Sequence, residues 1–301
     1  MFIHRTERGM FILLPHDPQR PHVFTTEGED RPAGNYPGPG PEMPLTEMED
    51  SIERALGIRV PLSPPPQGAP AQLRRLCTRN SCQAESYRHG RVFVGGDAAH
   101  ASHGPTLNIA LGDAANLGWK LAAAAQGRAP EGLLDTYASE RRPVAARGLV
   151  HTQAETALAS PCAETTALRD LCGELLGHTE TVRTLADGMV GTATRYDMGE
   201  DDAGAPTGWF APPLTVTCDD GQVCRLAERL HDARPLLLDL TGDTHLAPIA
   251  EPFSDRVHRI SASADHAPSP ALLIRPDGYV AWSGSDPDGL KTALTRWFSP
   301  T

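Results

Sequence analysis

Residues 91–147, RVFVGGDAAHASHGPTLNIALGDAANLGWKLAAAAQGRAPEGLLDTYASERRPVAAR, decide the fold of this chain. The run at 91–95 is apolar and predicts a buried strand, which continues into a tight Gly-Gly-Asp turn. An Ala- and Leu-rich run with apolar residues every four positions then predicts a helix over 113–126. A strand, a turn and a helix in this order form either a routine connection or a nucleotide site.

Upstream of this stretch, the sequence predicts part of a sheet. Residues 1–27 alternate apolar and charged segments, which indicates two or three antiparallel strands. Thr46 and Glu49 match a capping box, and they predict a short helix over 48–57 that Gly57 ends. Because the chain begins abruptly in a strand, we expect the preceding strands of this sheet to be absent or to lie on another chain.

Downstream, the pattern changes from helices to a small mixed domain. Residues 133–147 are helical in pattern, with a kink or break at Pro143, and 150–191 predict two or three further helices. An acidic Gly/Pro-rich linker at 198–213 precedes strands and helices in the order β-α-β and then β-β-α, which is typical of a thioredoxin-like domain. The absence of a Cys-x-x-Cys motif predicts that this domain performs no thiol chemistry.

Composition limits the classes of function. The chain has 301 residues and a formal charge of -11, which argues against nucleic-acid binding because neutralising phosphates needs clustered Lys and Arg. No apolar run reaches the roughly 18 residues of a membrane helix, and charges interrupt the N-terminal segment, so we expect a cytoplasmic protein without a membrane anchor. Six cysteines without metal-ligand spacing predict free thiols and no metal site.

Asp97 is the residue with the clearest chemistry. An aspartate in a tight Gly-rich turn can accept hydrogen bonds from sugar hydroxyls. The N-terminus of the helix that follows would direct unpaired backbone N–H groups at a ring carbonyl or a phosphate.

Three motifs together carry a resemblance to a known family: GGDAAH at 95–100, DAANLGWKLA at 113–122 and LLDTYASERRPVA at 133–145. They resemble the flavin-binding part of the para-hydroxybenzoate hydroxylase-type monooxygenases, especially the aromatic polyketide hydroxylases with a thioredoxin-like C-terminal domain. The likeness implies FAD as cofactor, NAD(P)H as reductant and an aromatic small-molecule substrate. It also implies that Asp97 binds the ribityl chain and that the segment before Asn108 passes beside the flavin ring, so the cofactor-binding candidates are Gly96, Asp97, Pro105, Leu107 and Asn108.

The expected fold is therefore α+β, a partial flavin-monooxygenase fold with an antiparallel substrate-domain sheet, flavin-domain helices and a thioredoxin-like domain. We place the domains at 1–90, 91–197 and 198–301. Two departures from the family stand out. The sequence has no Gly-x-Gly-x-x-Gly turn to hold the cofactor's phosphates, and the loop ASHGPTL at 101–107 is shorter than the usual glycine-rich run. We therefore expect a chain that binds flavin poorly by itself.

Several other residues have more than one interpretation. His100 and His103 are candidate catalytic acid/base groups, although the first is usually structural in the family. Trp119 is expected in the core rather than stacked on a substrate, and Asp113 is expected to stabilise a helix dipole. For Glu140, Arg141 and Arg142, a solvated or structural role is favoured over contact with a cofactor.

These observations leave three hypotheses of function. The first is a truncated or split FAD-dependent monooxygenase that hydroxylates an aromatic polyketide-like substrate together with a partner chain bearing the N-terminal Rossmann segment. The second is a flavin-independent cyclase, dehydratase or isomerase on the same scaffold, with the two histidines as acid/base. The third is a non-catalytic accessory subunit that dimerises through the thioredoxin-like domain.

Overall fold

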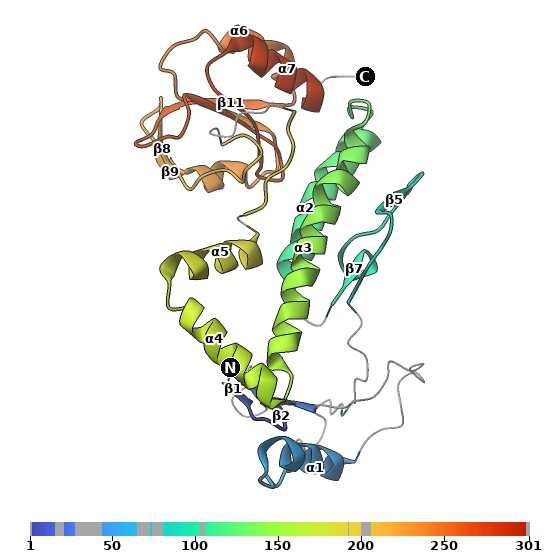
Figure 1. Cartoon of the computed structure of the whole chain (residues 1–301). Helices are drawn as coiled ribbons and strands as arrows, with labels where there is room; N and C mark the ends of the chain where they lie inside the picture. Colours follow the sequence, from blue (N-terminus) through green and yellow to red (C-terminus); the bar gives the residue numbers. More distant parts are fainter. Residues whose placement is uncertain are drawn as a thin grey trace. The chain divides into compact units, whose positions relative to one another are not determined.

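The computed structural model describes residues 2–15, 21–27, 44–64, 73, 81–102, 106–191, 193–199 and 206–298. These residues form two compact units, which we describe separately (Figure 1). The first unit comprises residues 1–81, 102–104 and 150–182, and the second comprises residues 82–101, 105–149 and 183–301. The three-domain division at 1–90, 91–197 and 198–301 stays a prediction.

The first unit contains a three-stranded antiparallel sheet, as the alternating pattern predicted. Its strands pair in the order β1 (Phe2–Arg5), β2 (Gly9–Leu14) and β3 (His22–Glu27). Helix α1 (Leu45–Leu56) packs on β2 and β3 and ends at Gly57, whose φ of 76° only glycine adopts easily. The expected loop at 28–44 lies almost entirely outside the described residues.

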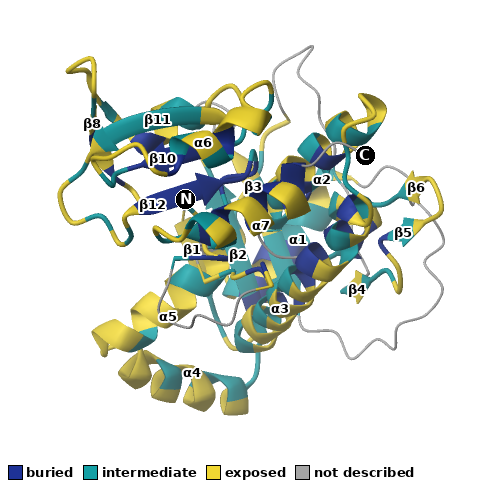
Figure 2. Cartoon of the chain, turned by 90° about the horizontal axis from the view of Figure 1, so that it is seen from above, coloured by how far each residue is buried: buried dark blue, intermediate teal, exposed yellow. Residues whose placement is uncertain are grey.

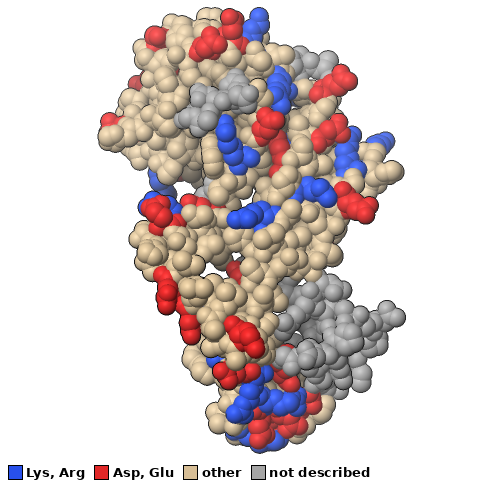
Figure 3. Space-filling model, in the orientation of Figure 1, with Lys and Arg blue, Asp and Glu red and all other residues tan. Residues whose placement is uncertain are grey.

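The capping box predicted for α1 is wrong. The helix begins at Leu45 behind Pro44, so Thr46 lies inside the first turn and no side chain caps the N-terminus. The Glu49 carboxylate accepts the backbone N–H of Leu62 instead. Around this helix, acidic and basic side chains are interleaved, as Figure 3 shows.

The two long helices of the second unit are α2 (Leu107–Ala125) and the first half of α3 (Thr136–Ala159), which follows a short 3₁₀ turn at Leu133–Asp135. The helix predicted over 113–126 therefore begins six residues earlier. Of the kink or break predicted at Pro143, the break is wrong, because α3 continues through this residue, and the kink stays a prediction. Proline has no backbone N–H, so the carbonyl of Ser139, four residues before Pro143, has no partner within the helix. Both residues are exposed, so water can donate to that carbonyl. Further along the chain lie α4 (Ala163–Leu175) and α5 (Thr179–Val190), as predicted.

Before α2, the chain forms two small hairpins. Strand β4 (Cys82–Gln83) pairs with β7 (His100–Ala101), and β5 (Arg88–His89) pairs with β6 (Val92–Phe93). The buried strand predicted at 91–95 is therefore wrong in length and in burial, because Val92 is 65% exposed. Only Phe93 and Val94 pack inward, against the buried rings of Tyr87 and Tyr137.

The C-terminal part of the second unit has the predicted thioredoxin-like topology. Its sheet runs in the order β13-β12-β10-β11-β8-β9, with β10 and β11 parallel and β12 and β13 antiparallel. Its strands are β8 (Thr215–Cys218), β9 (Val223–Arg225), β10 (Leu236–Asp239), β11 (His258–Ser263), β12 (Ala271–Ile274) and β13 (Val280–Ser283). Its helices are the 3₁₀ turn η3 (Leu226–Leu230), α6 (Ala247–Ala250), the 3₁₀ turn η4 (Glu251–Phe253) and α7 (Pro287–Phe298).

The core of the second unit lies at this sheet. Strands β10 and β12 are buried along their whole length (Figure 2), because apolar clusters pack on both of their faces. One cluster includes Trp297 of α7 and also receives Trp119 of α2, which confirms the expected core position of Trp119. No helix within the described ranges is both long and apolar enough to cross a membrane.

Candidate functional site

The Gly-Gly-Asp turn is a tight and partly exposed feature of the second unit. It forms a 3₁₀ turn, η1 (Gly96–Ala98), in which Gly96 has a φ of 58°. A Cβ on Gly95 would lie 2.8 Å from the Tyr137 hydroxyl, and one on Gly96 would lie 3.6 Å from Cβ of Ala110 in the first turn of α2. The two glycines therefore let the turn lie close against α2 and α3.

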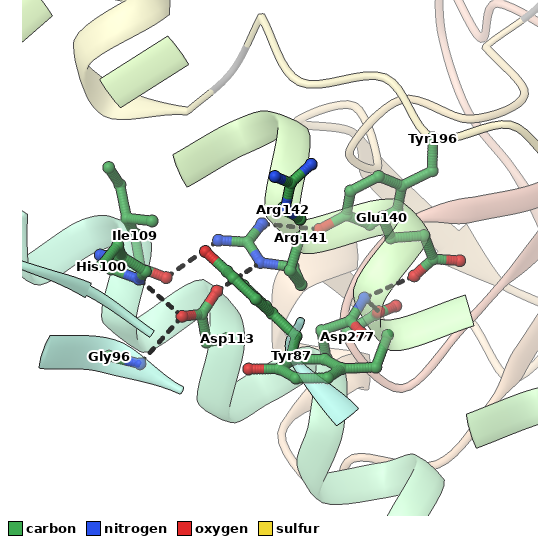
Figure 4. A network of polar contacts seen from close by, with 12 residues as sticks. Tyr87, Gly96, His100, Ile109, Asp113, Glu140, Arg141, Arg142, Tyr196 and Asp277 are labelled. Carbon is green, nitrogen blue, oxygen red and sulfur yellow. Dashed lines mark hydrogen bonds and ion pairs between the residues drawn. The ribbon is translucent and has the colours of Figure 1, made fainter. Parts of the chain in front are cut away.

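Asp113 fixes this turn from within α2. Its Oδ2 accepts the Gly96 backbone N–H at 3.0 Å and lies 2.8 Å from His100 Nε2, while its Oδ1 accepts Arg141 Nε at 2.8 Å (Figure 4). Asp113, His100 and Arg141 are each at most 3% exposed. The expectation that Asp113 stabilises a helix dipole is wrong, since α2 begins six residues earlier and the carboxylate bonds three groups from other segments.

Arg141 connects this network to two further segments. Its Nη1 donates to the Tyr196 hydroxyl at 2.7 Å and its Nη2 donates to the Ile109 carbonyl at 2.9 Å. A Cβ on Gly112 would lie 2.6 Å from Nη2, so a glycine is needed for the guanidinium to reach α2. Turn η1, the start of α2 and helix α3 are thus held in one arrangement, and Arg141 has the structural role that was favoured.

The predicted site residues occupy different environments. Asp97 is exposed on the turn, and Leu107 and Asn108 are exposed on the first turn of α2. His100 is buried and held by Asp113 rather than exposed. His103 and Pro105 lie outside the described residues. The catalytic and cofactor-binding roles of all these residues stay predictions.

A second buried polar network lies further along α2 and α3. Arg275, in the turn after β12, donates to Glu140 at 2.7 and 2.8 Å and also bonds Asp277. Lys120 Nζ donates to Glu140 at 2.7 Å, and Asn116 donates to both carboxylates. Two acids and two bases thus balance, which is the condition under which buried charges are tolerated.

Aromatic rings enclose the guanidinium of this network. Its Cζ lies 4.5 Å from the ring centroid of Trp297, 5.3 Å from that of Trp119 and 5.4 Å from that of Tyr196. Electron-rich ring faces stabilise a cation that has lost its water. The structural role favoured for Glu140 is therefore confirmed, whereas Arg142 is exposed.

The pKa values of this network predict a loss of stability in acid. Burial by itself would raise the pKa of Glu140, but the hydrogen bonds and charge of Arg275, together with Lys120, lower it from 4.5 to about 2. The folded state thus holds its proton more weakly than the unfolded state, so the stabilisation is complete above pH 4.5 and is lost as the pH falls towards 2. Across that range, we expect Glu140 to account for about 3 kcal/mol.

Urea unfolding at several pH values between 5 and 2 would measure this contribution. The Glu140→Gln variant is the comparison, because it keeps the shape of the side chain without its titration. A loss of stability on acidification that is equally steep in both proteins would contradict the assignment to Glu140.

The exposed edge of the site has groups that fit a flavin. The Asp97 carboxylate can accept hydrogen bonds from the hydroxyls of a ribityl chain. The first backbone N–H groups of α2 have no partner within the helix, and Thr106 provides no side-chain cap. Because η1 lies against this helix start, an acceptor for hydroxyls and donors for a ring carbonyl lie side by side.

Comparison with known proteins places the chain in a family. A family described as FAD binding domain matches residues 3–152, and one described as aromatic-ring hydroxylase, C-terminal, matches residues 205–301. The rifampicin monooxygenase of Streptomyces venezuelae is 42% identical over 220 residues, which cover 72% of this chain and 44% of that protein. The chain belongs to the FAD-dependent aromatic-ring hydroxylases, as the three motifs indicated.

Solved structures extend the likeness to nearly the whole chain. CabE, an aromatic hydroxylase from angucycline biosynthesis, has a TM-score of 0.84 at 34% identity, over 99% of this chain and 61% of CabE. The Diels-Alderase PyrE3 from the biosynthetic pathway of pyrroindomycins has a TM-score of 0.78 at 30% identity, over 100% of this chain and 59% of PyrE3. The predicted α+β flavin-monooxygenase fold is confirmed. The matched part of the chain spans 44–61% of the length of these proteins.

FAD is the cofactor that these matches support. In this chain, Asp97 and the backbone at the start of α2 are the groups that would hold it. When bound, the flavin would supply the redox chemistry. The protein's own contribution would be to fix the turn and the helix start relative to each other through Asp113 and Arg141.

Proposed function

We propose that this protein provides the ribityl- and ring-binding part of an FAD-dependent hydroxylase that acts on an aromatic polyketide-like substrate. One observation carries the proposal: the exposed Asp97 lies on a turn that Asp113 fixes against the start of α2. Because this turn is already held in place, no conformational entropy has to be lost in ordering it when a polar chain binds. NAD(P)H would be the reductant.

An exposed apolar row on the sheet of the first unit favours an apolar substrate. Helix α1 covers the face that carries Thr25, whose hydroxyl bonds Ser51 at 2.6 Å. On the opposite face, a cross-strand row consists of Ile3, Ile12 and Phe24. Ile3 is 50% exposed and Phe24 is 48% exposed, so this row offers an apolar surface on which an aromatic ring system could lie.

The outer face of α2 supports a partner that carries the phosphate-binding segment. The apolar side chains exposed along this helix are Leu107, Leu111, Ala114, Ala115, Leu121 and Ala122. The surface at Gly118 is also open, because a Cβ there would meet nothing within 4 Å. We propose that a Rossmann-type segment packs on this face, supplied by the same polypeptide or by a second chain. A homodimer remains an alternative.

Replacing Asp97 by alanine is expected to weaken FAD binding about ten- to a hundredfold, because a hydrogen bond to a charged group contributes about 1.5–3 kcal/mol. Titration of the protein with FAD, followed by flavin absorbance and fluorescence, would measure the dissociation constant. It should be done with and without a co-expressed partner bearing Gly-x-Gly-x-x-Gly, and we expect a yellow complex with the partner.

The matched control is Asp135→Ala, which removes another exposed aspartate of the same unit. It should leave the dissociation constant for FAD unchanged. An equal affinity of wild type and Asp97→Ala, or a colourless preparation under both conditions, would refute the proposed role.

A second candidate is a flavin-independent ring-forming reaction. Its support is the similarity to PyrE3, which is described as a Diels-Alderase. A preorganised apolar surface such as the Ile3 row could hold a polyene or aromatic chain for cyclisation, dehydration or isomerisation. Turnover of such a substrate in buffer free of flavin and NAD(P)H would support this candidate over hydroxylation.

A further inference from the structure

Two cysteines face each other across the β8–β9 hairpin. Val216 pairs with Cys224 in the register of the two strands, and Cys218 lies two residues beyond Val216 on the same face. Both cysteines pack against the same apolar cluster. The hairpin therefore carries a diagonal pair of free thiols.

Arg229 of η3 contacts both sulfurs. Its Nε lies 3.1 Å from Cys224 Sγ and its Nη2 lies 3.5 Å from Cys218 Sγ. The same guanidinium also donates to the Gln222 side chain in the hairpin loop. A guanidinium in this position stabilises a thiolate, which is the reactive form of cysteine. Arg229 lies closer to Cys224 than to Cys218, whose pKa burial raises, so we assign Cys224 as the nucleophile.

The surroundings allow a disulfide to form. Among the described strands, β9 lies at the edge of the sheet and pairs with β8 alone, so β9 can twist towards Cys218 while β8 stays paired with β11. A disulfide needs Cβ atoms about 3.5–4.5 Å apart, and twist shortens one diagonal of a hairpin. Both cysteines have intermediate exposure, so a small oxidant can reach their thiols.

We propose that Cys224 and Cys218 form a reversible disulfide, with hydrogen peroxide or an organic hydroperoxide as the oxidant. In the first step, the Cys224 thiolate attacks a peroxide oxygen, the O–O bond breaks and a sulfenic acid forms, while the leaving oxide takes up a proton. In the second step, the Cys218 sulfur attacks the sulfenic sulfur, the S–S bond forms and the S–O bond breaks, and the hydroxide leaves as water with the Cys218 proton. An external dithiol reverses the change.

This site differs from a Cys-x-x-Cys motif, because its thiols lie on adjacent strands rather than at a helix start. The absence of Cys-x-x-Cys, from which no thiol chemistry was predicted, does not bear on thiols on adjacent strands. The proposal is independent of FAD binding, since none of its residues belongs to the flavin site.

The test uses the reduced full-length chain treated with an equimolar amount of hydrogen peroxide. The tryptic peptide 196–225 contains both cysteines, and we expect it to lose the mass of two hydrogens and to regain it with dithiothreitol. Titratable thiols should fall by two of the six. A wild-type peptide that keeps its mass, or gains only oxygen, would overturn the proposal.

Variants separate the steps. Cys218→Ser should accumulate a sulfenic acid on Cys224 that dimedone traps, whereas Cys224→Ser should form neither product. Arg229→Gln should slow the reaction about tenfold, the effect expected from losing one charge-assisted hydrogen bond. Cys172→Ser, which changes a thiol elsewhere in the chain, should leave formation of the disulfide unchanged. An unchanged rate in Arg229→Gln, with its melting temperature also unchanged, would overturn the role of Arg229.

Discussion

Replacing Arg275 by methionine is expected to lower the free energy of unfolding by about 3–5 kcal/mol, the cost of breaking a buried ion pair by removing one partner. The substitution leaves Glu140 with Lys120 and Asn116, but it leaves Asp277 with only the amide of Asn116. It also removes the guanidinium from the face of Tyr196 and leaves Trp119 and Trp297 with only their contacts to Lys120 and Arg296. Urea unfolding followed by Trp fluorescence reports directly on this region.

The control is Arg225→Met, the same substitution in an ion pair with Glu228, whose arginine side chain is 79% exposed. It should cost about 1 kcal/mol or less, because exposed pairs contribute little. Equal stabilities of the two variants would show that the buried network adds nothing to folding.

The second large effect is expected for Asp113→Asn. An amide keeps the size of the side chain but removes the charge that pairs with the buried Arg141, at a cost of about 3–5 kcal/mol. Since the Gly96 N–H donates to this carboxylate, the turn should loosen more than the rest of the chain. Hydrogen exchange should therefore speed up in a peptide covering 94–101, while exchange in β10 and β12 is affected less.

Asp135→Asn is the matched control, because the Asp135 side chain is 73% exposed in its pair with Arg88. Its stability and its exchange pattern should stay close to those of the wild type. Unchanged exchange at 94–101 in Asp113→Asn would mean that the buried carboxylate does not hold the turn.

Much of the fold could be predicted from the sequence because it depends on local patterns. Alternation indicated two or three N-terminal strands, of which the structure has three, and the order of elements indicated the thioredoxin-like topology. The errors arose where the surroundings of a residue override the local pattern. Pro143 was expected to kink or break a helix, yet α3 continues through this exposed position, where water can satisfy the freed carbonyl.

Helix α2 shows why the buried networks were missed. Asp113, Asn116 and Lys120 follow one another at helical spacing and are buried, while Leu111 and Leu121 are exposed. The fully buried residues of this helix are thus polar, while some of its large apolar side chains are exposed, which departs from the usual amphipathic pattern. A line of polar residues at i, i+3 and i+7 on an Ala/Leu-rich helix was the available signal, but the partners Arg141 and Arg275 are distant in sequence.

The Arg275 network also bears on how this chain can be recombined with its relatives. Its members come from α2, α3 and the turn after β12, and Arg275 bonds a residue 135 positions earlier in the chain. A chimera that exchanges the C-terminal domain at the linker would put a foreign turn against Glu140 and Lys120. Exchanges that move α2, α3 and the β12–β13 turn together should yield folded hybrids more often. The segments that must be exchanged together therefore lie on both sides of the linker.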